Sequence, residues 1–330
     1  MNSFGRLFRV SIFGESHGES VGITVDGCPA GLSLTAEDLL PDLERRKGGI
    51  QKGTTPRQEA DFPFFKSGLF NNKTTGFPIT ILFENNNTRS EDYNKQRSIP
   101  RPGHADWVAH QKFGGFEDYR GGGHFSARLT TGLVAAGAIA KKIMPGIQIH
   151  ARVISIGGET DTEKGLQKAI EAKDSVGGVV ECRVTGLPVG LGEPYFDSVE
   201  SVLAHILFAI PAVRGVEFGT GFAAAAMFGS EHNDAIIDNS GKTRTNHAGG
   251  VVGGISNGNE LVFRLAVKPT SSTSRIQHSL NWETGTTEDF SIKGRHDLCV
   301  ALRAPVIVEA VTAIVLADFM LLEQKIKRVL

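Results

Sequence analysis

The feature that most limits the possible folds of this chain is a turn motif that occurs twice. The pattern V-x-G-x-P-x-G-L is found at residues 25–32 and again at residues 184–191, and each copy ends a strand-like run and precedes a helical pattern. Gly and Pro in this arrangement are typical of a strand that turns into the start of a helix. A second correspondence agrees with the first, because segments containing glycine and histidine, at 121–124 and 294–296, each precede a long apolar helical pattern.

The repeated motif predicts two related halves, roughly residues 1–145 and 146–330, packed as a single domain, although a short turn motif can also recur by chance. Runs that alternate apolar and polar residues predict strands. They lie at residues 6–13, 20–26, 77–84, 147–156, 176–185 and 260–267. Helical patterns begin at Thr35 and cover 128–143 and 303–323, and their apolar middles predict burial. Interspersed strands and helices favour a layered α/β or α+β sandwich.

Composition excludes several classes of protein. The 330 residues carry 35 Lys and Arg against 36 Asp and Glu, so the whole molecule has no field that attracts nucleic acid or a membrane. The N-terminus lacks a signal-peptide pattern and no 18 uncharged apolar residues occur in a row, so we expect a cytoplasmic protein. The three cysteines are far apart, which is typical of small buried side chains rather than of disulfides. The 40 glycines indicate many tight turns or close backbone approaches.

Several histidines lie in glycine-rich loops, where functional side chains are common. They are His17, His104, His124, His247 and His296. The segment 45–57, RRKGGIQKGTTPR, carries five basic residues and no acid. Such a segment is either a solvated helix end or a site for phosphate and carboxylate groups, which guanidinium binds well. Arginines also flank His104 and His124, at Arg101, Arg120 and Arg128, and this favours the anion site.

Familiar catalytic motifs are absent from the sequence. Residues 14–18 do not form a G-x-S-x-G elbow, residues 121–123 lack the Lys of a Walker A loop, and His104 with Asp106 lacks the further ligands of a metal site. The glycine runs at 121–123, 249–250 and 253–254, together with residues 268–272, suit a flat, phosphate-bearing cofactor that lies against backbone. The residues therefore predict an enzyme for a small, multiply anionic substrate, with histidines as acids.

At these residues the chain resembles the chorismate synthase family, and the resemblance runs along nearly its whole length. The matching segments are FGESHG at 13–18, VDGCPAG at 25–31, RR…TTPR within 45–57, TTGFPI at 74–79, RPGHAD at 101–106, DYRGGGH at 118–124, SAR at 126–128, AAGAIAKK at 135–142, GLGEP at 190–194, NHAGG at 246–250, GGIS at 253–256, KPTSS at 268–272 and GRHD at 294–297. Each segment is weak evidence alone, but so many in the same order are specific.

The resemblance implies a trans-1,4 elimination in which 5-enolpyruvylshikimate-3-phosphate loses phosphate and a C6 hydrogen to give chorismate. It implies reduced FMN as cofactor without net redox change, and leaves open whether NADPH reduces that flavin. His17 matches the histidine that assists phosphate departure, and His104 matches the one that protonates or stabilises the reduced flavin near N1. Asp297, with Ser16 and Ser126, matches the group that helps flavin N5 accept the C6 proton.

The resemblance also assigns binding residues. The implied substrate contacts are Arg46, Lys52, Arg101 and Arg128. The implied flavin contacts are His124, Phe125, Ser126, Pro211, Ala212, Gly253, Lys268, Pro269, Thr270, Ser271, Ser272 and Arg295. No metal is implied. The family fold is an α+β single domain, a β-α-β sandwich with an internal pseudo-repeat, and the implied assembly is a homotetramer that binds neither nucleic acid nor membrane.

This chain departs from the family pattern at a few positions. His124 and Phe125 stand where many members have Arg-Ser, and Lys52 stands where arginine is common, so a guanidinium fork becomes a point charge. Leu298 replaces a usual proline, a change that we expect to be silent. About thirty residues that many relatives carry after Gly158 are missing.

Two other classes of function compete with this lyase. One is a non-catalytic protein that binds a polyanion such as RNA, but single-stranded RNA sites favour aromatic side chains among the charges, and residues 45–57 contain none. The other is an inactive protein with the same fold.

Overall fold

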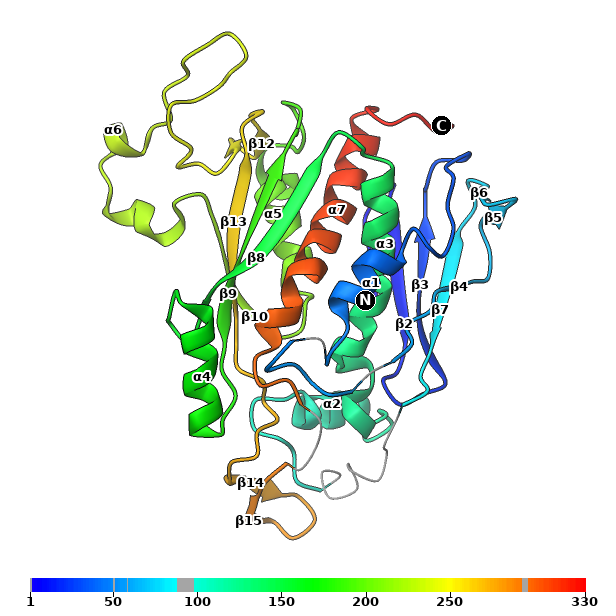
Figure 1. The fold of residues 1–330 in the computed structure, drawn as a ribbon, viewed down its shortest axis with the longest axis vertical. Helices are drawn as coiled ribbons and strands as arrows, with labels where there is room; N and C mark the ends of the chain where they lie inside the picture. The colour runs from blue at the N-terminus through cyan, green and yellow to red at the C-terminus, as the bar shows by residue number, and fades with distance from the viewer. Residues whose placement is uncertain (1, 50, 58, 88–97, 293–295) are drawn as a thin grey trace.

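The computed structural model describes residues 2–49, 51–57, 59–87, 98–292 and 296–330, and it contains two antiparallel sheets on either side of a layer of helices (Figure 1). The first sheet has the order β1 (Ser3–Phe4), β2 (Arg9–Gly14), β3 (Ser20–Asp26), β7 (Ile79–Glu84) and β4 (Phe64–Phe65). The second has the order β10 (Val213–Phe218), β13 (Leu261–Val267), β9 (Gly178–Thr185) and β8 (Gln148–Ile156). The predicted β-α-β sandwich is therefore confirmed.

Two long helices form the centre of the sandwich. Helix α3 (Thr130–Lys142) packs on the first sheet, α7 (Ala304–Leu322) packs on the second, and the two helices contact each other. Both helices carry apolar side chains on nearly all sides, which is typical of a helix that is buried in the protein core. The helical stretch Val300–Leu322 is long and apolar enough to cross a membrane, but 78% of its most apolar window is buried inside the protein, as in a core helix.

The remaining elements surround this core. The helices are α1 (Leu40–Arg46), α2 (Asp106–Phe113), α4 (Thr162–Ala172), α5 (Val199–Leu207) and α6 (Gly229–His232), with the short 3-10 turns η2 (Arg120–Phe125), η3 (Ala127–Leu129), η4 (Tyr195–Asp197), η5 (Gly221–Ala226) and η6 (Val300–Arg303). Three small hairpins are β5 (Leu69–Phe70) with β6 (Lys73–Thr74), β11 (Val251–Val252) with β12 (Ile255–Ser256), and β14 (Gln277–Asn281) with β15 (Thr286–Phe290).

Most predicted elements are confirmed within a few residues, but the first helix is not. It begins at Leu40 rather than Thr35. The backbone N–H of Thr35 donates to the Asp38 carboxylate at 2.8 Å, and this side-chain bond forms a turn where we expected the first helical turn. The three cysteines are buried thiols, and burial raises the pKa of Cys28 to about 12.

The two copies of the repeated motif have similar backbone conformations. Gly27 and Gly31 follow β3 with positive φ, and Gly186 and Gly190 follow β9 with positive φ. Each half also supplies one antiparallel sheet and one long central helix. These similarities support the proposed division into repeats 1–145 and 146–330, which stays a prediction.

The central helices touch most closely at Gly137. A Cβ atom at this position would lie 2.3 Å from both Cα and Cβ of Ala310 in α7. We therefore expect Gly137→Ala to lower the free energy of unfolding by about 1–3 kcal/mol, because the helices must move apart and this outweighs the better helix propensity of alanine. Urea unfolding measures the effect. Gly146→Ala is the matched control because no atom lies within 4 Å of its added Cβ, and equal stability of the two variants would contradict the prediction.

Candidate active site

A cavity of about 590 Å³ lies where loops from both halves meet. Its walls come from segments around residues 46–48, 55–57, 59–61, 101–105, 121–133, 208–214, 268–272 and 296–303. The predicted site residues that line it are His17, Arg46, Arg101, His104, His124, Phe125, Ser126, Arg128, Pro211, Ala212, Lys268, Pro269, Thr270, Ser271, Ser272 and Asp297. Predictions that are spread over some 280 positions in the chain thus converge on one cavity.

Some predicted site residues lie elsewhere. Lys52 does not line the cavity, and its ammonium group instead donates to Gln167 of α4 at 3.2 Å. Gly253 lies in the turn between β11 and β12, also outside this cavity. Ser16 is fully buried behind the cavity wall, where its hydroxyl accepts a 3.4 Å hydrogen bond from Arg57. Arg295 lies outside the described residues.

His17 is held in the loop between β2 and β3 by close packing against glycine. A Cβ atom on Gly121 would lie 2.2 Å from the imidazole ring, so this position accepts no larger residue. The side chain is 8% exposed, and burial together with the Arg57 guanidinium lowers the pKa of His17 to about 4. His17 is therefore neutral at pH 7 in the free protein.

The pKa of His17 can be tested directly. In an NMR titration of the free protein, we expect its imidazole to protonate with a midpoint near pH 4. Between pH 6.5 and about 4 the unfolded chain binds a proton here that the folded chain does not, so this residue makes stability fall as pH falls through that window. The variant His17→Asn assigns the signal. A midpoint of 6.5 or above would contradict the burial that the structure gives this ring.

His104 belongs to a hydrogen-bonded group with Arg101, which is buried, and Asp106, which is partly buried. Its Nδ1 lies 2.5 Å from Asp106, and Arg101 donates to both oxygens of the same carboxylate at 2.7 Å. Burial alone would raise the pKa of Asp106, but the hydrogen bonds from Arg101 and His104 outweigh it and hold that pKa well below its usual range. An ionised carboxylate accepts, so the geometry places a hydrogen on Nδ1 and fixes the ring orientation.

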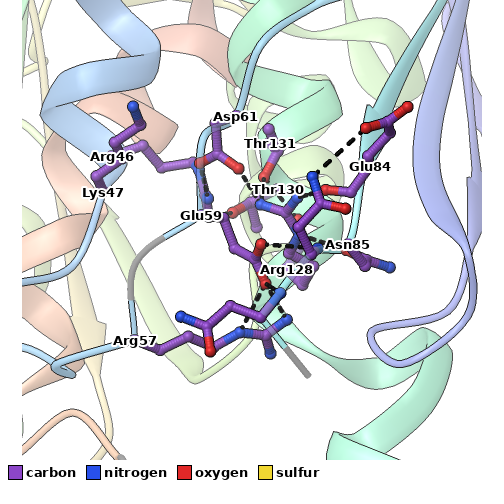
Figure 2. A network of polar contacts seen from close by, with 12 residues as sticks. Arg46, Lys47, Arg57, Glu59, Asp61, Glu84, Asn85, Arg128, Thr130 and Thr131 are labelled. Atoms are coloured by element: carbon purple, nitrogen blue, oxygen red, sulfur yellow. Dashed lines mark hydrogen bonds and ion pairs between the residues drawn. The ribbon is translucent and has the colours of Figure 1, made fainter. Parts of the chain in front are cut away.

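Arg46 and Arg128 share one buried carboxylate, Asp61 (Figure 2). Arg46 donates to Asp61 at 2.7 Å, and Arg128 forms an ion pair with the other oxygen while its Nε donates to Asn85 at 2.9 Å. Asp61 is 2% exposed and has a φ of +51°, an uncommon conformation for a residue with a side chain. Burial lowers the pKa of Arg46 to about 10, although Asp61 acts in the opposite direction.

Other cations of the cavity wall are also paired with carboxylates. Arg57 donates to Glu59 at 2.7 Å, and Arg303 donates to Asp297 at 3.0 Å (the first pair is seen in Figure 2). Asp297 also accepts from the backbone N–H of Thr55 at 2.8 Å. The sequence of segment 45–57 predicts arginines without acidic partners. In the structure, the arginines described above are instead paired with carboxylates from other segments.

The sequence predicts Asp297 as a site residue, but it does not predict the partner carboxylates Asp61 and Glu59. Asp61 and Glu59 lie just beyond the basic segment, with no motif around them that marks them. The spacing of His104 and Asp106 suggests an incomplete metal site, whereas Asp106 anchors His104 and Arg101. Arg57 lies inside the basic segment, but no motif there marks it as a site residue.

The glycine run 121–123 lies against two of the histidines. Gly121 packs on His17, and a Cβ atom on Gly122 would lie 3.1 Å from the ring of His104. The run thus gives both imidazoles room at the cavity wall. The runs at 249–250 and 253–254 lie outside the cavity wall.

The segment 268–272 offers polar groups to a bound molecule. The Thr270 hydroxyl oxygen is buried, and the described residues give it no hydrogen-bond partner. A buried polar atom without a partner is costly, and a ligand that supplies the missing bond removes that cost. Nearby, His124 donates from Nδ1 to the Gly14 carbonyl at 2.8 Å, which orients its ring. These groups suit a polar, planar cofactor such as a flavin.

Comparisons with known proteins identify the family. Residues 8–321 match the family model described as chorismate synthase. The chain is 71% identical over 330 residues to a protein named chorismate synthase from Chitinophaga pinensis, covering 100% of this chain and 99% of the relative. It is 46% identical to a protein of the same name from Dehalococcoides mccartyi, again over 100% and 99% of the two chains.

A solved structure is also similar. A crystal structure described as chorismate synthase superimposes with a TM-score of 0.74 at 28% identity, over 97% of this chain and 93% of that one. Members of this family are lyases, and the family implies a flavin cofactor in general and a small-molecule substrate. The chain therefore belongs to the chorismate synthase family.

Proposed function

We propose that this chain converts 5-enolpyruvylshikimate-3-phosphate to chorismate with reduced FMN. The substrate loses a proton from C6 and phosphate from C3, and one ring double bond becomes two, so no net oxidation occurs. The observation that carries the proposal is the convergence of His17, His104 and three arginines on a single cavity, in a chain with a 71% identical relative of that name.

The arginines suit the charges of this substrate, which carries two carboxylates and a phosphate. Arg46, Arg101 and Arg128 line the cavity, and each is fixed there by a carboxylate. Guanidinium groups bind carboxylate and phosphate oxygens well. Arg46 Nε is buried and has no hydrogen-bond partner among the described residues. A preorganised set of this kind binds a rigid polyanion with little reordering of side chains.

His17 is suited to act on the leaving phosphate. It is neutral in the free protein, but a phosphate dianion beside it favours the charged imidazolium and raises its pKa. His17 thus takes up a proton when substrate binds, and it can donate that proton to the departing phosphate. A positioned general acid of this kind accelerates the step. The substrate phosphate therefore favours the protonated form of His17 that acts as the general acid.

His104 is suited to contact the flavin. The Nδ1–H group is engaged by Asp106, which leaves Nε2 for a bound molecule. We propose that His124 to Ser126, Pro211, Ala212 and Lys268 to Ser272 hold FMN in the same cavity. Reduced FMN supplies the electron density and the N5 base that this elimination requires. Asp297 and Ser126 line the same cavity, and we propose that they assist proton removal from C6.

An anaerobic assay tests the proposal. Protein, chemically reduced FMN and the enolpyruvyl substrate should release phosphate and produce the absorbance of chorismate, whereas oxidised FMN should give no product. The same protein without flavin is the control. Failure to form product by well-folded protein that binds both molecules would overturn the proposed activity.

We further propose a cytoplasmic homotetramer that binds neither nucleic acid nor membrane, with NADPH acting, if at all, as the reductant of the flavin. Support for self-association comes from the arm between β10 and β11, which extends from the body (Figure 1). It exposes large apolar side chains, with Phe222 at 83%, Phe228 at 77% and Ile236 at 71% exposure. Such surfaces mark protein contacts, and analytical ultracentrifugation tests the assembly.

A further inference from the structure

The turn that carries the glycine run 121–123 is fixed by an ion pair between two residues just before the run. Arg120 donates from Nε to Oδ1 of Asp118 and from Nη2 to Oδ2, each at 2.8 Å, and its backbone N–H donates to Oδ1 at 3.1 Å. A bidentate pair of this kind fixes geometry as well as charge. The three glycines that follow have φ values of +58°, +86° and +51°. Because glycine backbone is flexible, the pair restricts a segment that would otherwise move freely.

This turn is joined to the loop that carries His17. The Gly123 carbonyl accepts a hydrogen bond from the backbone N–H of Ser16 at 3.1 Å. The glycine run also packs on both sides, because a Cβ atom at Gly121 would lie 2.2 Å from the His17 ring and one at Gly123 would lie 2.1 Å from the Asp118 carbonyl oxygen. The position of the imidazole therefore depends on the conformation of this turn.

Four charged side chains act on the proton affinity of His17. Burial has the largest effect and lowers its pKa, and the guanidinium groups of Arg57 and Arg120 lower it further. The carboxylates of Asp118 and Glu59 act in the opposite direction, Asp118 more strongly than Glu59, because a nearby negative charge favours the imidazolium. Among these side chains, Asp118 is thus the one that most favours the protonated form of His17.

We propose that Asp118 is a positioning residue for His17. With Arg120 it holds the turn against which the imidazole packs, and its negative charge favours the protonated ring. Arg120 offsets part of that charge, so His17 stays neutral until a phosphate dianion lies beside it. The inference rests on the proposed function in one respect, which is the role of His17 as the acid for the departing phosphate.

An NMR titration of Asp118→Asn separates an effect of charge from a purely structural one. Asparagine keeps an oxygen that accepts from Arg120, so the turn can stay in place, but the negative charge is lost. We expect the titration midpoint of His17 to fall below the wild-type value of about 4. If Asp118 only held the turn, its loss would expose the ring to water and the midpoint would rise toward 6.5. A midpoint at or above the wild-type value would overturn the inference.

Replacement of Arg120 should move the same midpoint in the opposite direction. Arg120→Gln removes a cation that disfavours the imidazolium, so the His17 midpoint should rise above about 4, whereas Arg120→Lys keeps the charge and should stay closer to wild type. The matched control is Arg183→Gln, because Arg183 of β9 also donates to a carboxylate two residues earlier, Glu181, at 2.9 Å, but lies outside the cavity. Equal midpoints in Arg120→Gln and wild type would contradict the inference.

Turnover provides a second readout. Asp118→Asn should lower kcat about tenfold with a smaller change in KM, because a smaller fraction of His17 is protonated when substrate is bound. The pH above which kcat declines should also move to lower values, and Asp118→Glu, which keeps the charge, should recover most of the lost kcat. Circular dichroism verifies the fold of each variant. The NMR midpoints need no turnover, so they test the inference even if no chorismate forms, and a wild-type kcat and pH profile in Asp118→Asn would remove Asp118 from the mechanism.

Discussion

Replacing His17 or His104 by alanine is expected to lower kcat by about 100-fold or more, as for the loss of a general acid. His17 lies at the cavity wall beside Arg57, and His104 is fixed there by Asp106. Neither ring is an ordinary core side chain, because each is packed on glycine and faces the cavity. Anaerobic turnover with saturating reduced FMN measures both effects.

The two variants should differ in their dependence on pH. His17→Ala removes the group that we propose gains a proton on substrate binding, so its remaining activity should lose the part of the pH profile that reports this protonation. His150→Ala on β8 is the control, since His150 is exposed and does not line the cavity. Wild-type rates in both His17→Ala and His104→Ala would remove these residues from the mechanism.

Replacing Asp61 is expected to have the largest effect on stability. The substitution Asp61→Asn leaves Arg46 and Arg128 buried and without their shared anion, and breaking a buried ion pair from one side costs about 3–5 kcal/mol. Asparagine tolerates the positive φ of this position, so the substitution tests the charge and not the backbone. Urea unfolding at pH 7 measures the loss.

A half-exposed carboxylate provides the comparison for Asp61. Asp174 lies 3.9 Å from Arg275, and its Oδ1 accepts from the Ser175 N–H and the Thr273 hydroxyl at 2.8 Å each. An asparagine amide oxygen can accept the same two hydrogen bonds, so Asp174→Asn should change stability by less than about 1 kcal/mol. The variant Asp61→Ala should lose more than Asp61→Asn, because alanine adds backbone strain at this φ. A loss for Asp61→Asn as small as that for Asp174→Asn would show that the two arginines find other partners.

The sequence predicts the framework of this fold better than the electrostatics of its site. Alternating apolar residues locate β3, β7, β8, β9 and β13, because burial of one sheet face fixes a period of two. The arginines and histidines are found because glycine-rich loops and clustered basic residues are visible along the chain. Asp61 is not found, since a carboxylate that neutralises a distant arginine leaves no local pattern. Lys52 is predicted as a substrate contact but does not line the cavity, because its side chain bonds Gln167 of the neighbouring helix α4.

The contact between α3 and α7 has a consequence for how the chain reaches its native state. Residues Thr130–Ala140 of α3 are buried on every side, and α7 from the other end of the chain supplies part of that cover. Neither half can thus close its own core, even though each has its own sheet. The decisive contacts join positions far apart in sequence, and such high contact order slows folding. A ribosome must therefore finish most of this chain before its first stable core can form.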